Sequence, residues 1–299
     1  MSYALGLAAI CVVTFGPAGP LLARAQWTHR APRAAVALWQ AIGISGALAA
    51  IGFGLAVTVL PAHAGLRGGI ARLGHQAMGG HPLQGLGISG ALGLTLASDV
   101  CIVLVIGLVT TGIRTTMDRS RHRQLLDLVS HSVDEVPDVH VLDDPRVTAY
   151  CLPGVRPRIV VSAGALRLLG RHEIGAVVAH ERGHAHGRHG VVMLPFASMD
   201  SLLRWMPYVR HARTEVALLL EMAADDFAVR SSRPRILAGA LLEMSASGAS
   251  PTCAFAANST AVASRIHRLL RPGRTSISVA AVALAASTVV LILPLSALI

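Results

Sequence analysis

The hydrophobic residues of this sequence are gathered in long blocks separated by polar segments. Four blocks reach the roughly 20 residues that an α-helix needs to cross the hydrocarbon core of a membrane. They cover residues 3–22, 34–60, 86–113 and 277–299. Asp99 is the only acidic residue within them. The pattern therefore predicts about four transmembrane helices, with a polar segment of domain size between the third and the fourth.

Two other structures produce blocks of this kind. A buried helix in a soluble core is disfavoured by the length of the blocks and by their lack of charge. The first block could instead be a secretory signal peptide. No basic residue precedes its apolar part, so we favour a span that the mature protein keeps.

The composition supports a membrane protein and argues against a nucleic-acid-binding one. The 299 residues are 53% hydrophobic and 14% charged, whereas soluble domains carry about 25% charged residues. The net charge of +10 comes from 26 basic residues, all of them Arg. Many flank the predicted spans, in clusters at residues 114–123 and 265–274. We therefore expect membrane lipid, and no direct nucleic acid, as the partner of these charges.

The distribution of Arg also predicts topology. The first loop has three Arg residues and the second loop has two, while both Arg clusters fall in the polar segment. Cytoplasmic segments carry the excess of positive charge, so the first loop and the polar segment should be cytoplasmic and both ends of the chain outside. The expected organisation is three spans at residues 1–113, a cytoplasmic domain at residues 114–274 and a fourth span at residues 275–299.

Within the domain, the apolar periodicity predicts both helices and strands. Helices are expected at residues 119–132, 172–186 and 214–230, and strands at residues 139–142, 147–151 and 158–162. The Gly-rich residues 62–85 read as an unstructured connector. The predicted fold class is α+β, mainly α.

A metal-binding pattern lies in the second predicted helix of the domain. His180 and His184 are four residues apart, which places both imidazole rings on one face, close enough to bind one Zn²⁺. Glu181 lies about 100° around the helix from His180. From there it can take a proton from the attacking water and pass it to the leaving amine. The segment predicts a catalytic zinc site with Glu181 as the general base.

A catalytic zinc needs a third protein ligand, and several residues compete for this role. His186 and His189 follow closely but are out of phase with the zinc-binding face. Glu215 and Glu221 lie on the next long helix. We favour Glu221, because Asp225 follows four residues later on the same face, where its carboxylate can orient a ligand histidine.

These motifs resemble those of a known group of enzymes. The pair at residues 180–184 and 221–225 resembles the gluzincin arrangement of zinc ligands. The surrounding stretches are similar to BlaR/MecR-type antirepressor membrane metallopeptidases and, more loosely, to HtpX-type and CAAX-prenyl-protease-type membrane peptidases. These stretches are residues 158–162, 173–181, 205–207 and 264–266. The resemblance covers about residues 139–270 and implies that a gluzincin-like metalloprotease domain is inserted between the spans.

The resemblance implies a zinc-dependent endopeptidase of the bacterial inner membrane, with its protease domain on the cytoplasmic side. The implied substrate is a cytoplasmic or membrane protein, in this group often a winged-helix transcriptional repressor. The β-lactam sensors of the group also carry an external domain whose acylation motif needs Lys. This sequence has no Lys, so β-lactam sensing is not expected. Nothing in the sequence indicates an oligomeric state.

One strand and three residues are candidates for handling the substrate. Zincins hold a peptide as an added strand on a sheet edge. Residues 158–162 are the candidate edge, with a plain core strand as the alternative. A donor should stabilise the oxyanion that forms at the scissile carbonyl. Tyr150, His211 and Arg265 are the candidates for this contact.

Three other functions compete with a signalling protease. A quality-control protease of HtpX type is compatible with the same motifs. A non-catalytic membrane scaffold would use four zinc ligands and would have no need of Glu181. A transporter would use Asp99 on an ion path, although a contact of Asp99 with polar neighbours is the simpler interpretation. The intact motif favours the enzyme.

Overall fold

The computed structural model describes residues 2–59, 65–80, 86–132, 139–154, 157–248, 259–271 and 277–296. It is mainly helical with one four-stranded sheet, as the sequence predicts. The helices are α1 (Ser2–Phe15), α2 (Ala18–Ala23), the 3₁₀ helix η1 (Gln26–His29), α3 (Pro32–Val59), α4 (Gly65–Met78), α5 (Ile88–Val129), α6 (Ala163–Leu168), α7 (Arg171–His186), α8 (His189–Val192), α9 (Leu194–Leu203), α10 (Pro207–Ala228), α11 (Pro234–Ala246), α12 (Ser259–Leu270) and α13 (Ile277–Ser296). The strands are β1 (Ser130–Ser132), β2 (Val139–Leu142), β3 (Ala149–Leu152) and β4 (Arg158–Ser162).

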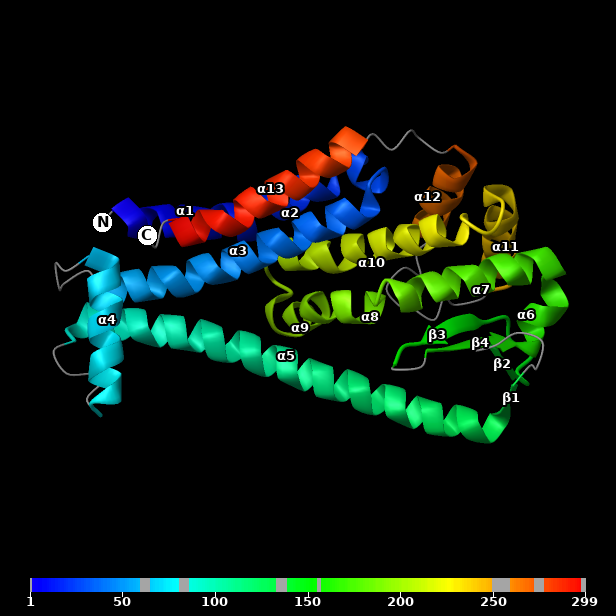
Figure 1. Cartoon of the computed structure of the whole chain (residues 1–299), viewed down its shortest axis with the longest axis horizontal. Coiled ribbons are helices and arrows are strands. Elements are labelled where there is room, and N and C mark those ends of the chain that lie inside the picture. Colours follow the sequence, from blue (N-terminus) through cyan, green and yellow to red (C-terminus); the bar gives the residue numbers. More distant parts are fainter. Residues whose placement is uncertain are drawn as a thin grey trace.

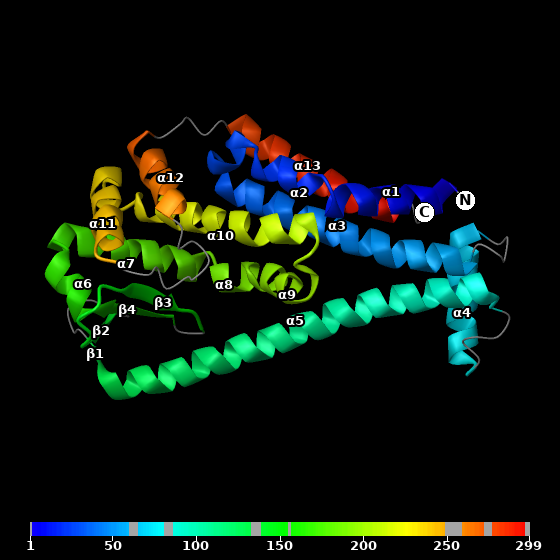
Figure 2. The ribbon, with the colours of Figure 1, turned by 180° about the vertical axis from the view of Figure 1, so that it is seen from behind.

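The molecule is elongated, with apolar helices at one end and the sheet at the other (Figures 1 and 2). Three helical segments of the described part of the chain are long and apolar enough to cross a membrane: Pro32–Val59, Ile88–Leu128 and Ser278–Ser296. They correspond to the second, third and fourth predicted spans. The protein is therefore a mainly helical membrane protein.

The structure differs from the prediction at the first apolar block. Residues 3–22 do not form one helix but two, α1 of 14 residues and α2 of six. The break falls at Gly16 and Pro17, because proline lacks the amide hydrogen that continues a helix. At 1.5 Å per residue α1 is about 21 Å long, shorter than the hydrocarbon core of about 30 Å.

Two further predictions are corrected around α5. The expected span at residues 86–113 and the expected helix at residues 119–132 are one continuous helix of 42 residues, because no Gly or Pro follows Gly112 before the helix ends. The last three residues of the expected helix, 130–132, form strand β1 instead. The Gly-rich connector at residues 62–85 contains helix α4. Residues 60–64 and 81–85, like Arg274 of the second Arg cluster, lie outside the described residues.

The sheet has the strand order β1-β2-β4-β3. β2 and β4 are parallel, and the other two pairings are antiparallel. Strands β2 and β4 begin and end as predicted, but β4 (Arg158–Ser162) lies between β2 and β3 and is not an edge. The prediction that these residues form the substrate edge is therefore wrong. The edge beside α7 is β3 (Figure 1).

Helices cover both faces of the sheet. On one face Val161 and Ile159 pack against Val177 and Val178 of α7. On the other, Val160 packs with Leu126, which belongs to the C-terminal end of α5. The sheet is thus held between α5 and α7, and the long helix connects it directly to the membrane end of the molecule.

Candidate metal centre

Helices α7 and α10 lie side by side and carry the predicted site (Figures 1 and 2). The start of α7 is fixed by Glu173, whose carboxylate accepts the Gly170 N–H at 2.9 Å. The apolar face of α7 packs on the sheet, which turns the face with His180 toward α10. Helix α10 opens with Pro207 in its first turn, a position where a missing amide hydrogen costs nothing.

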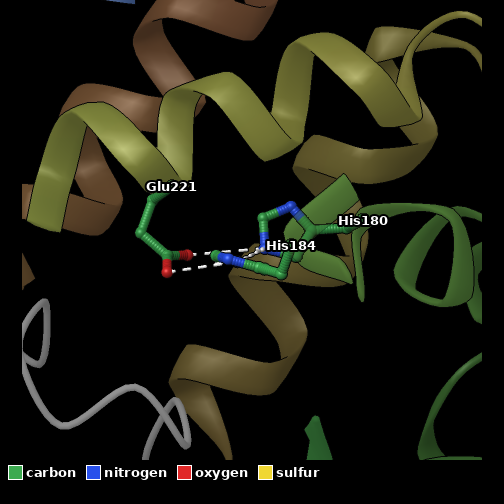
Figure 3. A group of neighbouring side chains, drawn as sticks. All are labelled: His180, His184 and Glu221. Atoms are coloured by element: carbon green, nitrogen blue, oxygen red, sulfur yellow. Dashed lines mark hydrogen bonds and ion pairs between the residues drawn. The ribbon is translucent and has the colours of Figure 1, made fainter. Parts of the chain in front are cut away.

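Two histidines and one glutamate converge between these helices. His180 Nε2 and His184 Nε2 lie 3.1 Å apart. The Glu221 carboxylate lies 3.4 Å from His180 Nε2 and 3.3 Å from His184 Nε2. Figure 3 shows the three side chains pointing toward one another from the two helices. Together they form a group that could hold a metal ion.

The spacing of these atoms suits zinc. In a tetrahedral site with bonds of about 2.0–2.1 Å, the ligand atoms lie about 3.3–3.4 Å from one another. The separations here, 3.1 Å, 3.3 Å and 3.4 Å, are close to that value. Two imidazoles and one carboxylate also leave a fourth position open, which is the donor set of catalytic zinc sites.

Behind the site, a buried ion-pair network holds the first histidine and the glutamate. His180 Nδ1 lies 2.9 Å from Asp225 Oδ1, while Nε2 of the same ring faces His184 and Glu221, where a metal would bind. Arg265 of α12 pairs with Asp225 at 2.7 Å and with Glu221 at 2.9 Å. Burial opposes ionisation of both acids, but Arg265 and the neighbouring histidines more than offset it. Arg265 and His180 lower the pKa of Asp225 to about 2, and Arg265 with both histidines holds the pKa of Glu221 well below its usual value.

The second histidine is held by another histidine. His184 Nδ1 lies 2.9 Å from His189 Nδ1, and His189 is buried. Burial, and then the proximity of His184, lowers the pKa of His189 to about 3. A neutral His189 ring can accept the Nδ1 proton of His184. Sequence reasoning weighed His189 as a metal ligand but missed this role.

Glu181 is half-buried beside the three convergent side chains. Burial raises the pKa of its carboxyl group, while His180 and His184 lower it. The backbone N–H of Cys151, on the edge strand β3, donates a hydrogen bond to this carboxylate. Glu181 therefore lies between the three convergent side chains and the sheet edge. A general base needs such a place and such a raised pKa.

A cavity of about 510 Å³ lies against the site. One wall is the edge strand β3 with Tyr150 and Cys151, and another is α5 at Thr115 and His122. Met193, between α8 and α9, and apolar residues of α9, α10 and α11 line another part of the cavity.

The other predicted residues are placed as follows. Tyr150 lines the cavity, and its hydroxyl lies 2.7 Å from His122 Nε2. His211 contacts the Pro207 carbonyl in its own helix and does not line the cavity. Glu215 is not in the metal-binding group, and His186 packs against Phe227. Of the oxyanion candidates, Tyr150 and Arg265 are thus near the site and His211 is not.

Comparison with known proteins gives matches in this region. The chain is 43% identical over 70 residues to "Plastoglobule-localized metallopeptidase 48, chloroplastic" of Arabidopsis thaliana, covering 23% of this chain and 20% of that protein. It is 35% identical over 75 residues to "Protease HtpX homolog" of Thermoplasma acidophilum, covering 24% of each chain. The matches thus span a fifth to a quarter of these relatives. No solved structure gives a significant match.

A family model covers more of the domain. Residues 116–225 match the model of Peptidase family M48. The matched segment begins in α5, includes the whole sheet and α7, and ends at Asp225 of α10. It therefore contains His180, Glu181, His184 and Glu221. Over residues 116–225 this membrane protein is similar to Peptidase family M48, and the convergent His-His-Glu group is its candidate metal centre.

Proposed function

We propose that this protein is a membrane-bound zinc metalloendopeptidase. The observation that carries the proposal is the convergence of His180 Nε2, His184 Nε2 and the Glu221 carboxylate next to a half-buried Glu181. Zinc held by these residues would polarise the attacked carbonyl and acidify water. Glu181 is placed to accept a proton from the attacking water and to deliver it to the leaving amine.

The sheet edge gives this chemistry a place for the substrate. β3 is the edge strand beside α7, and its Cys151 N–H already contacts Glu181. A peptide added along β3 would run past Glu181 through main-chain hydrogen bonds. Tyr150 lines the same cavity and is the candidate donor to the oxyanion. Arg265 is engaged by Asp225 and Glu221, and we assign it to holding those carboxylates.

We further propose that the physiological substrate is a protein reached from the cytoplasmic side of a bacterial inner membrane. A transcriptional repressor is the first candidate, supported by the resemblance of residues 158–162, 173–181 and 205–207 to antirepressor metallopeptidases. Turnover of membrane proteins is the second candidate, favoured by the match to a protein named as an HtpX homolog.

Comparison of the wild type with Glu181→Gln tests the activity. The variant keeps the three convergent side chains and removes the base, so it should bind zinc like the wild type and lose about 10²–10⁴-fold in peptide hydrolysis. The measurement is zinc content and cleavage rate on the same preparations. Undiminished hydrolysis by Glu181→Gln would refute this role. Proteins that accumulate only in cells expressing the variant are then candidate substrates.

A further inference from the structure

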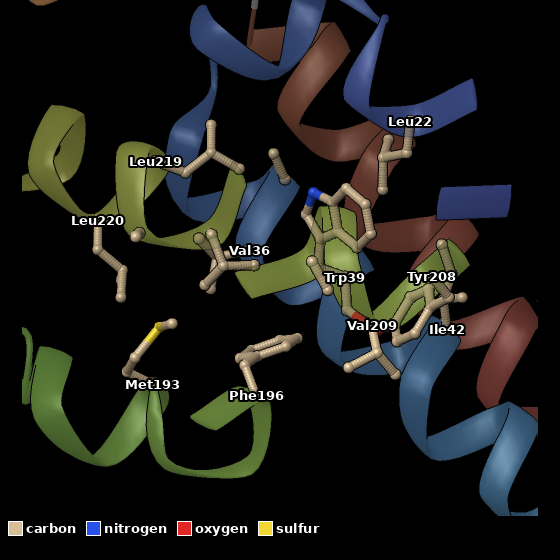
Figure 4. Close-up of a cluster of buried hydrophobic side chains, with 14 residues drawn as sticks. Leu22, Val36, Trp39, Ile42, Met193, Phe196, Tyr208, Val209, Leu219 and Leu220 are labelled. Atoms are coloured by element: carbon tan, nitrogen blue, oxygen red, sulfur yellow. The ribbon is translucent and has the colours of Figure 1, made fainter. Parts of the chain in front are cut away.

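The turn between α9 and α10 is packed among the apolar helices of the membrane end. Tyr208, in the first turn of α10, is fully buried, and its hydroxyl donates to the Trp39 carbonyl of α3 at 2.5 Å. A Cβ atom at Gly43 would lie 2.7 Å from the Tyr208 hydroxyl oxygen. Figure 4 shows Tyr208 beside Trp39 and Ile42, in a cluster that also includes Phe196 of α9.

The other side of the turn contacts α5. A Cβ atom at Gly107 would lie 2.6 Å from Leu202 Cδ1 and 2.9 Å from Ser198 Oγ. Gly107 thus lets these side chains of α9 pack directly on the backbone of the long helix. The end of α9 and the start of α10 are therefore held between α3 and α5, two of the three candidate spans.

The depth of the turn follows from the positions of these contacts along the spans. Arg33 and Arg114 are the charged residues nearest the inner ends of the two apolar segments. Gly107 lies seven residues before Arg114, about 10 Å along α5. Trp39 lies six residues after Arg33, about 9 Å along α3. The contacts with α3 and with α5 thus each place the turn about 10 Å deeper in the membrane than Arg33 and Arg114, the charges that mark the membrane boundary.

The exposed chemistry of the turn suits the interface between lipid headgroups and acyl chains. Trp205 is 74% exposed and Leu202 46% exposed, and Trp is enriched at this level of membrane proteins. Arg204 is exposed and can extend its charge to the headgroups. The one acid nearby, Asp200, is buried and paired with Arg204 and Arg213. Arg210, exposed in the first turn of α10, can extend its charge to the headgroups as Arg204 does.

We propose that the α9–α10 turn (residues 202–208) is inserted into the membrane interface and that the bilayer covers its exposed apolar face. This surface is continuous with the lipid-facing sides of α3 and α5. The insertion sets the height of the metal site. Glu221 lies 14 residues after Pro207, about 21 Å along α10, and so about 10 Å above the membrane boundary.

The cavity extends from the metal site toward the same boundary. Its lower wall includes Leu194 and Ala197 of α9 and Thr115 of α5, the residue that follows Arg114. An extended peptide rises about 3.3 Å per residue, so a site about 10 Å above the boundary is reached within a few residues of a membrane anchor. The site therefore takes peptide segments that lie this close to an anchor. This statement about the substrate rests on the proposed function, whereas the insertion of the turn does not.

Trp205 reports the insertion directly. The wild type and Trp205→Phe are reconstituted in vesicles whose lipids carry bromine on the acyl chains, and the difference in their fluorescence gives the contribution of Trp205. A matched control moves the probe to α11, as Trp205→Phe with Leu242→Trp, because Leu242 is 60% exposed at the far end of the molecule. Brominated lipid should quench Trp205 at least about twofold more than the control, and aqueous acrylamide the reverse. Equal quenching of the two positions would overturn the proposal.

The height of the site is tested with two anchored peptides of the same cleavable sequence. In one the sequence starts four residues from a transmembrane anchor. In the other a rigid helical spacer of about 20 residues, about 30 Å long, intervenes. Reconstituted enzyme should cleave the first at least about tenfold faster, and equal rates would overturn the placement. Unanchored peptide in detergent is the activity control. If it is not cleaved, the proposed function fails, and the quenching result alone decides the insertion.

Discussion

His184 Nδ1 lies 2.9 Å from Nδ1 of His189, a buried histidine that follows it by five residues. The nitrogen of His184 that faces the metal site is Nε2. The two nitrogens of one ring thus have separate partners, and His189 fixes the ring of His184 much as Asp225 fixes that of His180. Such contacts determine which nitrogen carries the proton and how the ligand is aimed.

Replacement of His189 should therefore weaken metal binding without removing a ligand. We expect His189→Ala to lower zinc affinity about 10–100-fold, as losses behind a ligand usually do. The measurement is competition with a chromogenic chelator. His186→Ala is the matched control, because His186 lies on the same helix as His184 but packs against Phe227. The zinc affinity of this variant should equal that of the wild type. Wild-type affinity in His189→Ala would contradict this role.

Zinc content distinguishes the two glutamates proposed on α10. Glu221→Ala should lose bound zinc, because its carboxylate is one of the three convergent groups. Glu215→Ala removes the same chemical group six residues earlier on the helix and should keep zinc. Metal analysis of the purified variants is sufficient. The assignment is incorrect if Glu215→Ala loses the metal and Glu221→Ala does not.

Arg265 should contribute to stability more than other paired arginines. Its guanidinium is buried and faces two carboxylates, those of Asp225 and Glu221. Loss of one partner from a buried ion pair costs about 3–5 kcal/mol, so Arg265→Met should lower the unfolding temperature strongly. Arg204→Met is the control, because the Arg204 side chain is 71% exposed, and exposed pairs contribute about 0–1 kcal/mol. Similar unfolding temperatures for the two variants would count against the network.

Topology is testable with single cysteines in a background that lacks the native ones. Both chain ends and α4 lie at the end of the molecule opposite the sheet (Figures 1 and 2). Met78, on α4, is 90% exposed, and the Arg146 side chain near the sheet is 84% exposed. A membrane-impermeant thiol reagent should label Met78→Cys in intact cells and Arg146→Cys only after lysis. Labelling of Arg146→Cys in intact cells would invert the topology and exclude cleavage of a cytoplasmic repressor.

Local spacing explains which parts of the site could be predicted. His180, Glu181 and His184 lie within one and a half turns of a helix, so periodicity alone predicts which of them share a face. Glu221 and Asp225 are related by the same four-residue spacing. The strands β2 and β4 follow from short apolar runs bounded by turns.

The rest depends on contacts that no local pattern contains. His189 reaches His184 because the chain turns at Arg188, whose φ of 47° is in the left-handed region. A prediction that continues the helix past Arg188 therefore gives the wrong position for His189. Arg265 meets Asp225 across 40 residues. The interior position of β4 is set by pairing with β3 and β2, not by its own sequence.

The continuous helix α5 has a mechanical consequence. It starts beside α4, at the end of the molecule opposite the sheet, and ends under the sheet, with Leu126 packed against Val160 (Figure 1). Its 42 residues extend about 63 Å at 1.5 Å per residue. A helix with no break can tilt as one rigid rod, so a tilt of about 5° around its N-terminal end displaces its C-terminal end by about 5 Å. A displacement of that size exceeds the spacing between neighbouring strands, about 4.8 Å, and it would act on the wall that faces Glu181 across the cavity.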